Sequence, residues 1–173
     1  MKNLVLVGFM GSGKTVVGKL VAQHLGMRFI DMDEEIEKRA GKKISEIFAH
    51  DGESYFRRLE RVLTKELAGQ EGLVVATGGG IVLDPRNITD FRKNAILIGL
   101  GVHVDTVLRR VGRQTHRPLL EGRDKRGQVE KLLELRGPLY HDAGTYIETD
   151  NRTIDEVVTA VAAVYHLGSV KAS

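Results

Sequence analysis

The residues Gly8-Phe9-Met10-Gly11-Ser12-Gly13-Lys14-Thr15 follow a short apolar run, Leu4–Val7, and lead into an amphipathic pattern, Lys14–Leu25. The stretch matches G-x-x-x-x-G-K-[ST] in full and lies between a predicted strand and a predicted helix. Glycine lets backbone N–H groups close around phosphate oxygens because no Cβ stands in the way. The helix that follows points the positive end of its dipole at the same anion. The stretch therefore predicts a phosphate-binding loop, called the P-loop below.

The P-loop also predicts how a nucleotide is held. The backbone of Gly11, Ser12 and Gly13 is expected to surround the phosphates, while Lys14 reaches the β- and γ-phosphates and the hydroxyl of Thr15 binds Mg²⁺. A glycine-rich turn that matches by chance is the competing interpretation, and the agreement of pattern and context argues against it. ATP and Mg²⁺ are therefore the expected cofactors.

Short apolar runs alternate with helical patterns along the chain, which predicts parallel βαβ units with helices on both faces of one sheet. The predicted strands are Leu4–Val7, Phe29–Ile30, Leu73–Ala76, Ala95–Ile98 and Tyr146–Ile147. The predicted helices are Lys14–Leu25, Asp33–Ala40, Glu53–Ala68, Val104–Val111, Val129–Leu135 and Thr153–Tyr165. No repeat or linker interrupts this order, so we expect a single α/β domain over residues 1–173. Ligands of such sheets gather beyond the carboxyl ends of the strands.

The composition limits the classes of protein that remain. Hydrophobic residues make up 42% of the 173 residues and charged residues 28%, which is typical of a globular domain rather than a disordered or membrane chain. The net charge of +3 is too small to require nucleic acid and suits an anionic small molecule. The apolar run near Met1 is too short for a signal peptide. The absence of cysteine excludes disulfides. We expect a cytoplasmic monomer without nucleic-acid or membrane partners.

A P-loop alone leaves a kinase, a GTPase, an ATPase motor and a passive nucleotide binder open. No Asn/Thr-Lys-x-Asp segment is present to recognise guanine, which argues against a GTPase. The third predicted strand runs into Gly78–Gly80 rather than into an acidic residue. The carboxylate near Mg²⁺ is therefore expected from Asp31 or Asp33, just after the second strand.

Two further features could bind the molecule that accepts the phosphoryl group, and each also has a purely structural interpretation. Asp31 and Asp33 share a face in extended geometry and can converge on one metal or hydroxyl, but Asp33 could equally cap the helix that follows. Three successive glycines, Gly78–Gly80, favour a ligand that approaches bare backbone, although a flexible turn would also explain them.

Basic residues give two further candidates. Arg57 and Arg58 both lie outside the apolar stripe of their helix, and periodicity does not choose between them. The segment Arg109–Arg126 is basic and punctuated by glycine, which suits a lid that closes over polyphosphate as well as a solvated loop. Within it, Arg117 precedes Pro118 and two leucines that could fix its position. The histidines have no metal-binding spacing.

Taken together, these motifs resemble shikimate kinases along nearly the whole chain. The resemblance rests on Gly8–Thr15, Asp31-Met32-Asp33, Gly52-Glu53, Phe56-Arg57-Arg58, Gly78–Gly80, Arg117-Pro118-Leu119-Leu120, and Arg136 before Pro138-Leu139-Tyr140. It implies a fold similar to nucleoside monophosphate kinases, with a three-layer α/β/α arrangement and a five-stranded parallel sheet. It also implies a flexible lid at approximately 112–125 and an acceptor-binding region at approximately 32–60.

The resemblance implies roles for individual residues. Arg57 and Arg136 pair with the carboxylate of shikimate, Asp33 hydrogen-bonds its hydroxyl groups, and Gly78, Gly79 and Gly80 lie beside them. Asp31 serves Mg²⁺ through a water molecule, and Arg117 faces the transferring phosphoryl group. Arg110 and Arg152 match segments that flank adenine.

We therefore expect an ATP-dependent shikimate kinase that phosphorylates the 3-hydroxyl group, with Lys14, Asp33 and Arg117 as catalytic residues. The alternatives are another small-molecule P-loop kinase, acting on gluconate or a nucleoside monophosphate, and a nucleotide-binding regulator without catalysis.

Overall fold

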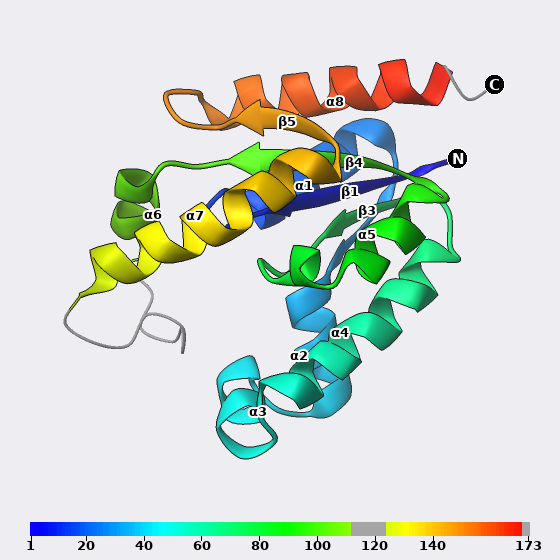
Figure 1. The fold of residues 1–173 in the computed structure, drawn as a ribbon. Helices are drawn as coiled ribbons and strands as arrows, with labels where there is room; N and C mark the ends of the chain where they lie inside the picture. The colour runs from blue at the N-terminus through cyan, green and yellow to red at the C-terminus, as the bar shows by residue number, and fades with distance from the viewer. Residues whose placement is uncertain (112–123, 171–173) are drawn as a thin grey trace.

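Five strands lie side by side in the order β2-β3-β1-β4-β5, and each neighbouring pair is parallel (Figure 1). The computed structural model describes residues 1–111 and 124–170. The strands are β1 (Asn3–Gly8), β2 (Arg28–Asp31), β3 (Leu73–Ala76), β4 (Ala95–Gly101) and β5 (Thr145–Glu148). Each contains one of the predicted strands, and the predicted five-stranded parallel sheet is confirmed.

The helices connect these strands in the expected α/β order. They are α1 (Lys14–Leu25), α2 (Met32–Ala40), α3 (Ile44–His50), α4 (Glu53–Ala68), α5 (Pro85–Arg92), α6 (Val104–Val111), α7 (Lys125–Ala143) and α8 (Ile154–Val170), with a 3-10 turn, η1 (Ile81–Leu83). Among the described residues, none of these helices is both long enough and apolar enough to cross a membrane.

Two apolar clusters fill the space on the two faces of the sheet. Along β1, Leu4 and Leu6 join a cluster with α1 and α8, while Val5 and Val7 join a cluster with α2, α4, α5 and α7. Side chains of a strand alternate between faces, so a run of buried residues packs against both layers. Figure 1 shows α8 on one side of the sheet and α4, α5 and α7 on the other. The predicted three-layer arrangement is confirmed.

Three helical segments differ most from prediction, and α8 also continues five residues past the predicted end at Tyr165. The sequence patterns did not reveal α3 or α5. The predicted helix Val129–Leu135 covers only the middle of α7, which continues through Pro138. Pro138 is exposed, and the buried side chains of Arg136 and Tyr140 on the other side of α7 hold this last part of the helix against the protein.

The connections at the carboxyl edge of the sheet carry the polar motifs. The P-loop follows β1, Asp31 ends β2, Thr77–Gly80 follow β3, and Thr149–Arg152 follow β5. Parallel strands bring these four connections to one edge.

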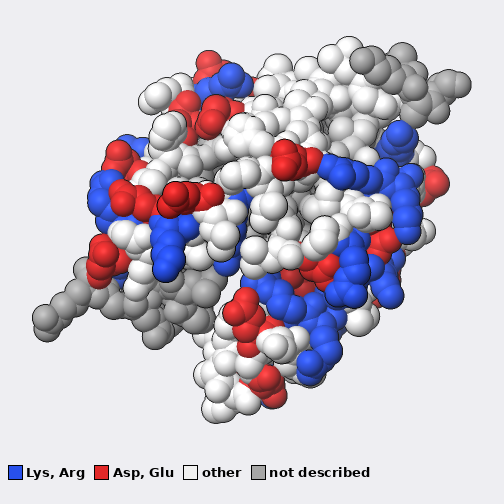
Figure 2. All heavy atoms as spheres, viewed as in Figure 1, with Lys and Arg blue, Asp and Glu red and all other residues white. Residues whose placement is uncertain are grey.

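On the face seen in Figure 2, basic side chains gather along α4 with acidic side chains among them.

Candidate active site

The P-loop has the backbone geometry that an anion site needs. Gly11 and Gly13 have φ angles of 76° and 94°, in a region that side chains other than glycine rarely adopt. A Cβ on Gly8 would lie 2.6 Å from the carbonyl oxygen of Leu100, so β4 approaches the loop closely. The start of α1 has no side-chain cap, and its first N–H groups remain directed at the loop. Glycine at these positions therefore allows the backbone of the P-loop to curve around an anion.

Lys14 lies inside the loop that it is expected to serve. Its Nζ donates to the carbonyl oxygens of Gly8 and Phe9 at 2.8 and 2.9 Å. These bonds hold the ammonium group within the turn of the loop, close to the backbone N–H groups at the start of α1. A positive group among amide donors is suited to bind the oxygens of a polyphosphate.

Asp31 connects the P-loop to the start of α2. Its Oδ2 accepts from the Thr15 hydroxyl at 2.7 Å, and its Oδ1 accepts from the backbone N–H groups of Asp33 and Glu34 at 3.0 and 3.3 Å. Asp31, not Asp33, is therefore the N-cap of α2. The capping interpretation offered for Asp33 is wrong.

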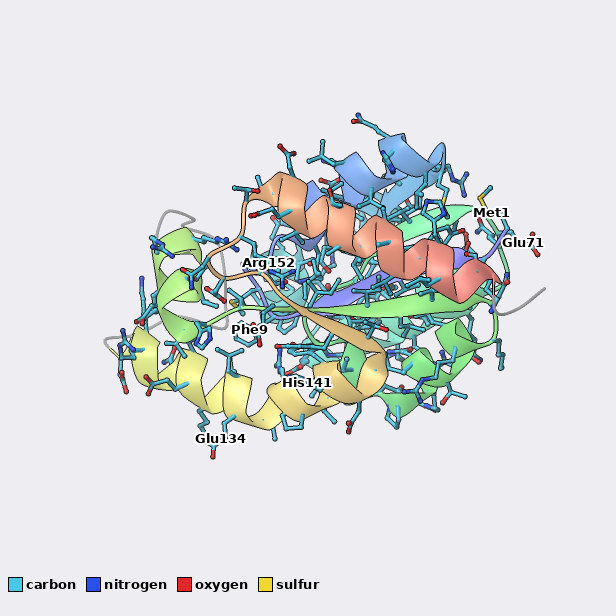
Figure 3. All side chains as sticks on the ribbon, turned by 90° about the horizontal axis from the view of Figure 1, so that it is seen from above. Met1, Phe9, Glu71, Glu134, His141 and Arg152 are labelled. Carbon is cyan, nitrogen blue, oxygen red and sulfur yellow. The ribbon has the colours of Figure 1, made fainter. Side chains whose placement is uncertain are left out.

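One cavity of about 360 Å³ lies over the P-loop. Its lining includes Arg110, whose Nη1 donates to the carbonyl oxygen of Gly11 at 2.7 Å, and Arg152 from the connection between β5 and α8. Figure 3 shows Arg152 at the same end of the sheet as Phe9 of the P-loop. The structure thus brings both predicted adenine-side arginines to the predicted nucleotide cavity.

A second cavity of about 660 Å³ adjoins the first, and Met10, Asp33 and Gly79 line both. Arg57 from α4 and Arg136 from α7 line the second cavity, which we call the acceptor pocket. The predicted carboxylate-binding arginines and Asp33 therefore share one pocket, with Asp33 at its boundary with the nucleotide cavity.

The structure distinguishes Arg57 from Arg58. Arg57 is half-buried, and its Nη1 and Nη2 donate to Glu60 and Glu53 at 2.9 and 3.0 Å. Arg58 is exposed, with its guanidinium over the ring of Tyr55. Only Arg57 lines the acceptor pocket.

The three glycines after β3 make room for pocket side chains. A Cβ on Gly78 would lie 2.8 Å from Oδ1 of Asp33 and 3.0 Å from Oε1 of Glu60, and one on Gly80 would overlap the guanidinium of Arg57. The φ of Gly80 is −94°, so backbone strain does not require glycine there. The side chains that approach this bare backbone are therefore Asp33, Glu60 and Arg57 of the protein itself. The sequence did not reveal these contacts.

Glu60 is a site residue that sequence reasoning missed. It lies on α4 within the stripe of Phe56, Leu63 and Leu67, and its side chain is 2% exposed. Burial raises the pKa of Glu60 to about 7, Arg57 opposes this effect, and the charge of Asp33 adds to it. A charged residue in an otherwise apolar stripe was the signal that could have revealed it.

Arg117 lies outside the described residues, as do residues 112–123 of the predicted lid. Its expected role in phosphoryl transfer stays a prediction.

Comparisons with known proteins agree with the resemblance seen in the motifs. The family model described as shikimate kinase matches residues 10–165. A shikimate kinase of Caldanaerobacter subterraneus subsp. tengcongensis is 44% identical over 165 residues, which cover 95% of this chain and 96% of the relative. A solved shikimate kinase of Acinetobacter baumannii, in complex with shikimate, matches with a TM-score of 0.89 and 37% identity over 93% of this chain and 90% of that one. A gluconokinase of Sinorhizobium meliloti shares the fold, with a TM-score of 0.61 and 19% identity over 95% of this chain and 92% of that one.

Proposed function

This chain belongs to the shikimate kinase family, and we propose that it transfers the γ-phosphoryl group of ATP to the 3-hydroxyl group of shikimate. The observation that carries the proposal is the pair of adjoining cavities that share Asp33. One cavity contains the P-loop, and the other contains two arginines suited to a carboxylate. A phosphoryl group held in the first cavity would face a hydroxyl group held in the second.

The acceptor pocket fits the chemistry of shikimate, a cyclohexene ring with one carboxylate and three hydroxyl groups. Arg57 and Arg136 supply planar guanidinium groups for the carboxylate. Phe48 and Phe56, with ring centroids 5.1 Å apart, provide an apolar wall for the ring. Asp33 accepts a hydrogen bond from the hydroxyl group that reacts, which places its oxygen toward the nucleotide.

Transfer of a phosphoryl group requires mainly positioning and charge stabilisation. Lys14 and the backbone N–H groups of the P-loop stabilise the negative charge on the phosphate oxygens. Arg117 joins them in the proposal, as the arginine that faces the transferring group. Arg110 and Arg152 hold the adenine side of the nucleotide.

The residues around Thr15 fit Mg²⁺, since a hydroxyl and a carboxylate are the hard oxygen donors that this ion prefers. The Thr15 hydroxyl and Asp31 lie 2.7 Å apart at the floor of the nucleotide cavity. We propose that Thr15 binds the ion and that Asp31 holds one of its water ligands. The ion supplies charge neutralisation on the β- and γ-phosphates.

We propose that residues 1–173 form one kinase domain, which acts as a cytoplasmic monomer without nucleic-acid or membrane partners. Described residues of one chain line both cavities, so the proposed reaction does not require residues of a second subunit. Light scattering coupled to size exclusion tests the monomeric state, and a dimer mass would contradict it.

A coupled ADP-release assay with a set of acceptors tests the reaction. We expect MgATP-dependent turnover with shikimate and little with gluconate or a nucleoside monophosphate. Product identification by phosphorus NMR should place the phosphate on the 3-hydroxyl group. Faster turnover with gluconate, or no ADP release with shikimate, would overturn the proposal.

A further inference from the structure

Glu60 combines a buried carboxylate with an incomplete set of hydrogen bonds. Its Oε2 accepts from Nη1 of Arg57 at 2.9 Å. Its Oε1 is buried and has no hydrogen-bond partner among the described residues. An oxygen in this state is costly when ionised, because it has lost water without gaining a donor. The same oxygen would lie 3.0 Å from a Cβ on Gly78, so it faces the bare backbone of the acceptor pocket.

Charged groups from several elements surround this carboxylate. Arg57 on α4 and Arg136 on α7 favour its ionised form, while Asp33 on α2 disfavours it. The α3 end of the pocket contributes Lys43 and Glu46, together with Glu34 and Glu37 of α2; Lys43 donates to Glu37 at 2.8 Å.

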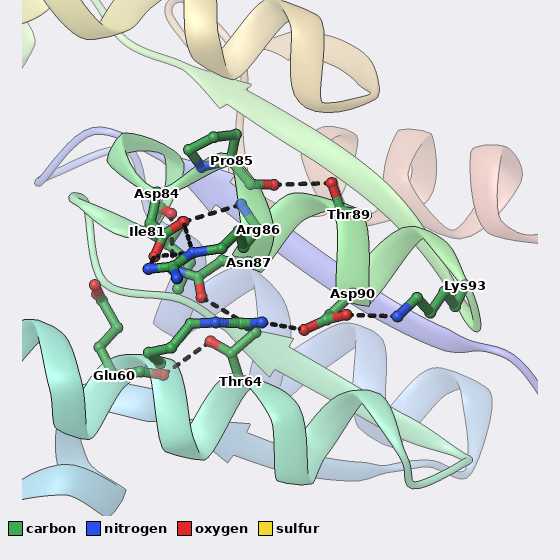
Figure 4. A network of polar contacts seen from close by, with 11 residues as sticks. Glu60, Thr64, Ile81, Asp84, Pro85, Arg86, Asn87, Thr89, Asp90 and Lys93 are labelled. Carbon is green, nitrogen blue, oxygen red and sulfur yellow. Dashed lines mark hydrogen bonds and ion pairs between the residues drawn. The ribbon is translucent and has the colours of Figure 1, made fainter.

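The charged groups of α5 are engaged elsewhere. Asp90 pairs with Arg61 on the neighbouring side of α4, and Figure 4 shows Glu60 pointing away from that network. Glu60 is thus placed among the groups of the acceptor pocket alone.

We propose that Glu60 takes up a proton from solvent when the carboxylate of the acceptor binds to Arg57 and Arg136. The inference rests on the proposed function, since it assumes an anionic acceptor in this pocket. An O–H bond forms at the Glu60 carboxyl group, and the hydronium ion or buffer acid that donates the proton loses one bond to hydrogen. No other group of the protein or the acceptor changes its covalent state. Glu60 is a positioning residue here, acting through Arg57.

Competition for Arg57 provides the physical cause. Arg57 already donates to Glu60 and Glu53, so an incoming carboxylate meets a guanidinium whose charge is partly offset. Placing a second negative charge beside Glu60 in a poorly solvated pocket penalises its ionised form further. A protonated Glu60 removes the repulsion and leaves the positive charge of Arg57 to the acceptor.

The sign of the pH dependence follows from linkage. Burial already raises the pKa of Glu60 to about 7 in the free protein, and the bound acceptor raises it further. Affinity for the acceptor is then fully present below the pKa of the free protein and falls as pH rises above it. The fall continues up to the pKa of the complex, with a limit of about tenfold per pH unit.

Calorimetric titration with shikimate in buffers of different ionisation enthalpy measures the proton directly. At about pH 7.5, where about one quarter of Glu60 is already protonated in the free protein, we expect an uptake of between about one half and three quarters of a proton per shikimate bound. Glu60→Gln should reduce the uptake to near zero. Glu53→Gln, which removes the exposed partner of Arg57, is the matched control and should retain it. Binding without proton uptake in the natural protein, or uptake that persists in Glu60→Gln, overturns the inference.

A second measurement keeps the inference testable if Glu60→Gln does not fold. The ¹³C resonance of the Glu60 carboxyl group in the natural protein should titrate at a higher pH with shikimate than without it. An unchanged midpoint overturns the inference. These outcomes differ from failure of the proposed function, in which shikimate neither binds nor is phosphorylated.

Discussion

Replacing Gly80 with alanine tests whether the acceptor pocket depends on Arg57 packing against bare backbone. The φ and ψ angles of Gly80, −94° and 2°, are accessible to alanine, so only the added methyl group acts. That methyl carbon would have three guanidinium atoms of Arg57 within 2.6 Å. Separation to normal contact requires a shift of roughly 1 Å, which breaks the 2.9 Å bond to Glu60.

The magnitude follows from the charged hydrogen bonds that are lost. A hydrogen bond to a charged group contributes about 1.5–3 kcal/mol. Since about 1.4 kcal/mol changes an equilibrium constant tenfold, misplacing Arg57 should raise the KM for shikimate by about 10- to 100-fold. The KM for ATP should stay near its natural value, because Gly80 lines the acceptor pocket and Arg57 does not line the nucleotide cavity.

Steady-state kinetics with each substrate varied in turn provides the assay. Gly137→Ala on α7 is the matched control, because a Cβ there has no neighbour within 4 Å. It should leave both KM values unchanged and stabilise the protein by about 0.5–1 kcal/mol, as alanine is the better helix residue. A KM for shikimate within about twofold of the natural value in Gly80→Ala would refute the packing argument.

Four further substitutions and one control substitution probe the site and its support. Asp33→Asn should largely abolish turnover while ATP still binds in a calorimetric titration; near-normal kcat would remove Asp33 from the mechanism. Arg57→Ala and Arg136→Ala should each raise the KM for shikimate by at least about tenfold. The control Arg58→Ala, at an exposed residue, should leave this KM unchanged. An unchanged KM for shikimate in both Arg57→Ala and Arg136→Ala would contradict the carboxylate assignment. Asn87→Ala should lower the free energy of unfolding by about 1–3 kcal/mol in urea titrations, because buried bonds to α4 and η1 are lost (Figure 4); an unchanged urea midpoint would count against that network.

The sheet was predictable because each strand contains a short apolar run and helical patterns separate these runs. Parallel strands buried on both faces give such runs, and β1 and β3 are buried along their whole length. The helix α3 was missed because its seven residues are too few for periodicity to show. The start of α5 did carry a signal, with Asp84 as N-cap and Pro85 at the first helical position.

The site was predictable where chemistry depends on local sequence and not where it depends on packing. The P-loop requires glycines at fixed spacing, so Gly8–Thr15 was sufficient. Arg57 and Arg58 are equivalent by periodicity. The resemblance selected Arg57, and the physical difference between the two is the approach of α4 to the loop after β3, which brings Arg57 against Gly80. Glu60 is buried by contacts between elements distant in sequence. Roles assigned by resemblance, including that of Arg117, stay predictions until the substitutions are made.

The two carbonyl oxygens that hold Lys14 have a consequence for how variants of that residue are interpreted. The ammonium group stabilises the turn by donating to the carbonyl oxygens of its first two residues. Any of these main-chain contacts that Lys14 exchanges for a phosphate oxygen reduces the net binding energy, because that energy is a difference between two sets of partners. Substituting methionine for Lys14 would remove the two hydrogen bonds that stabilise the P-loop as well as the positive charge. The resulting loss of activity would report on architecture and electrostatics together.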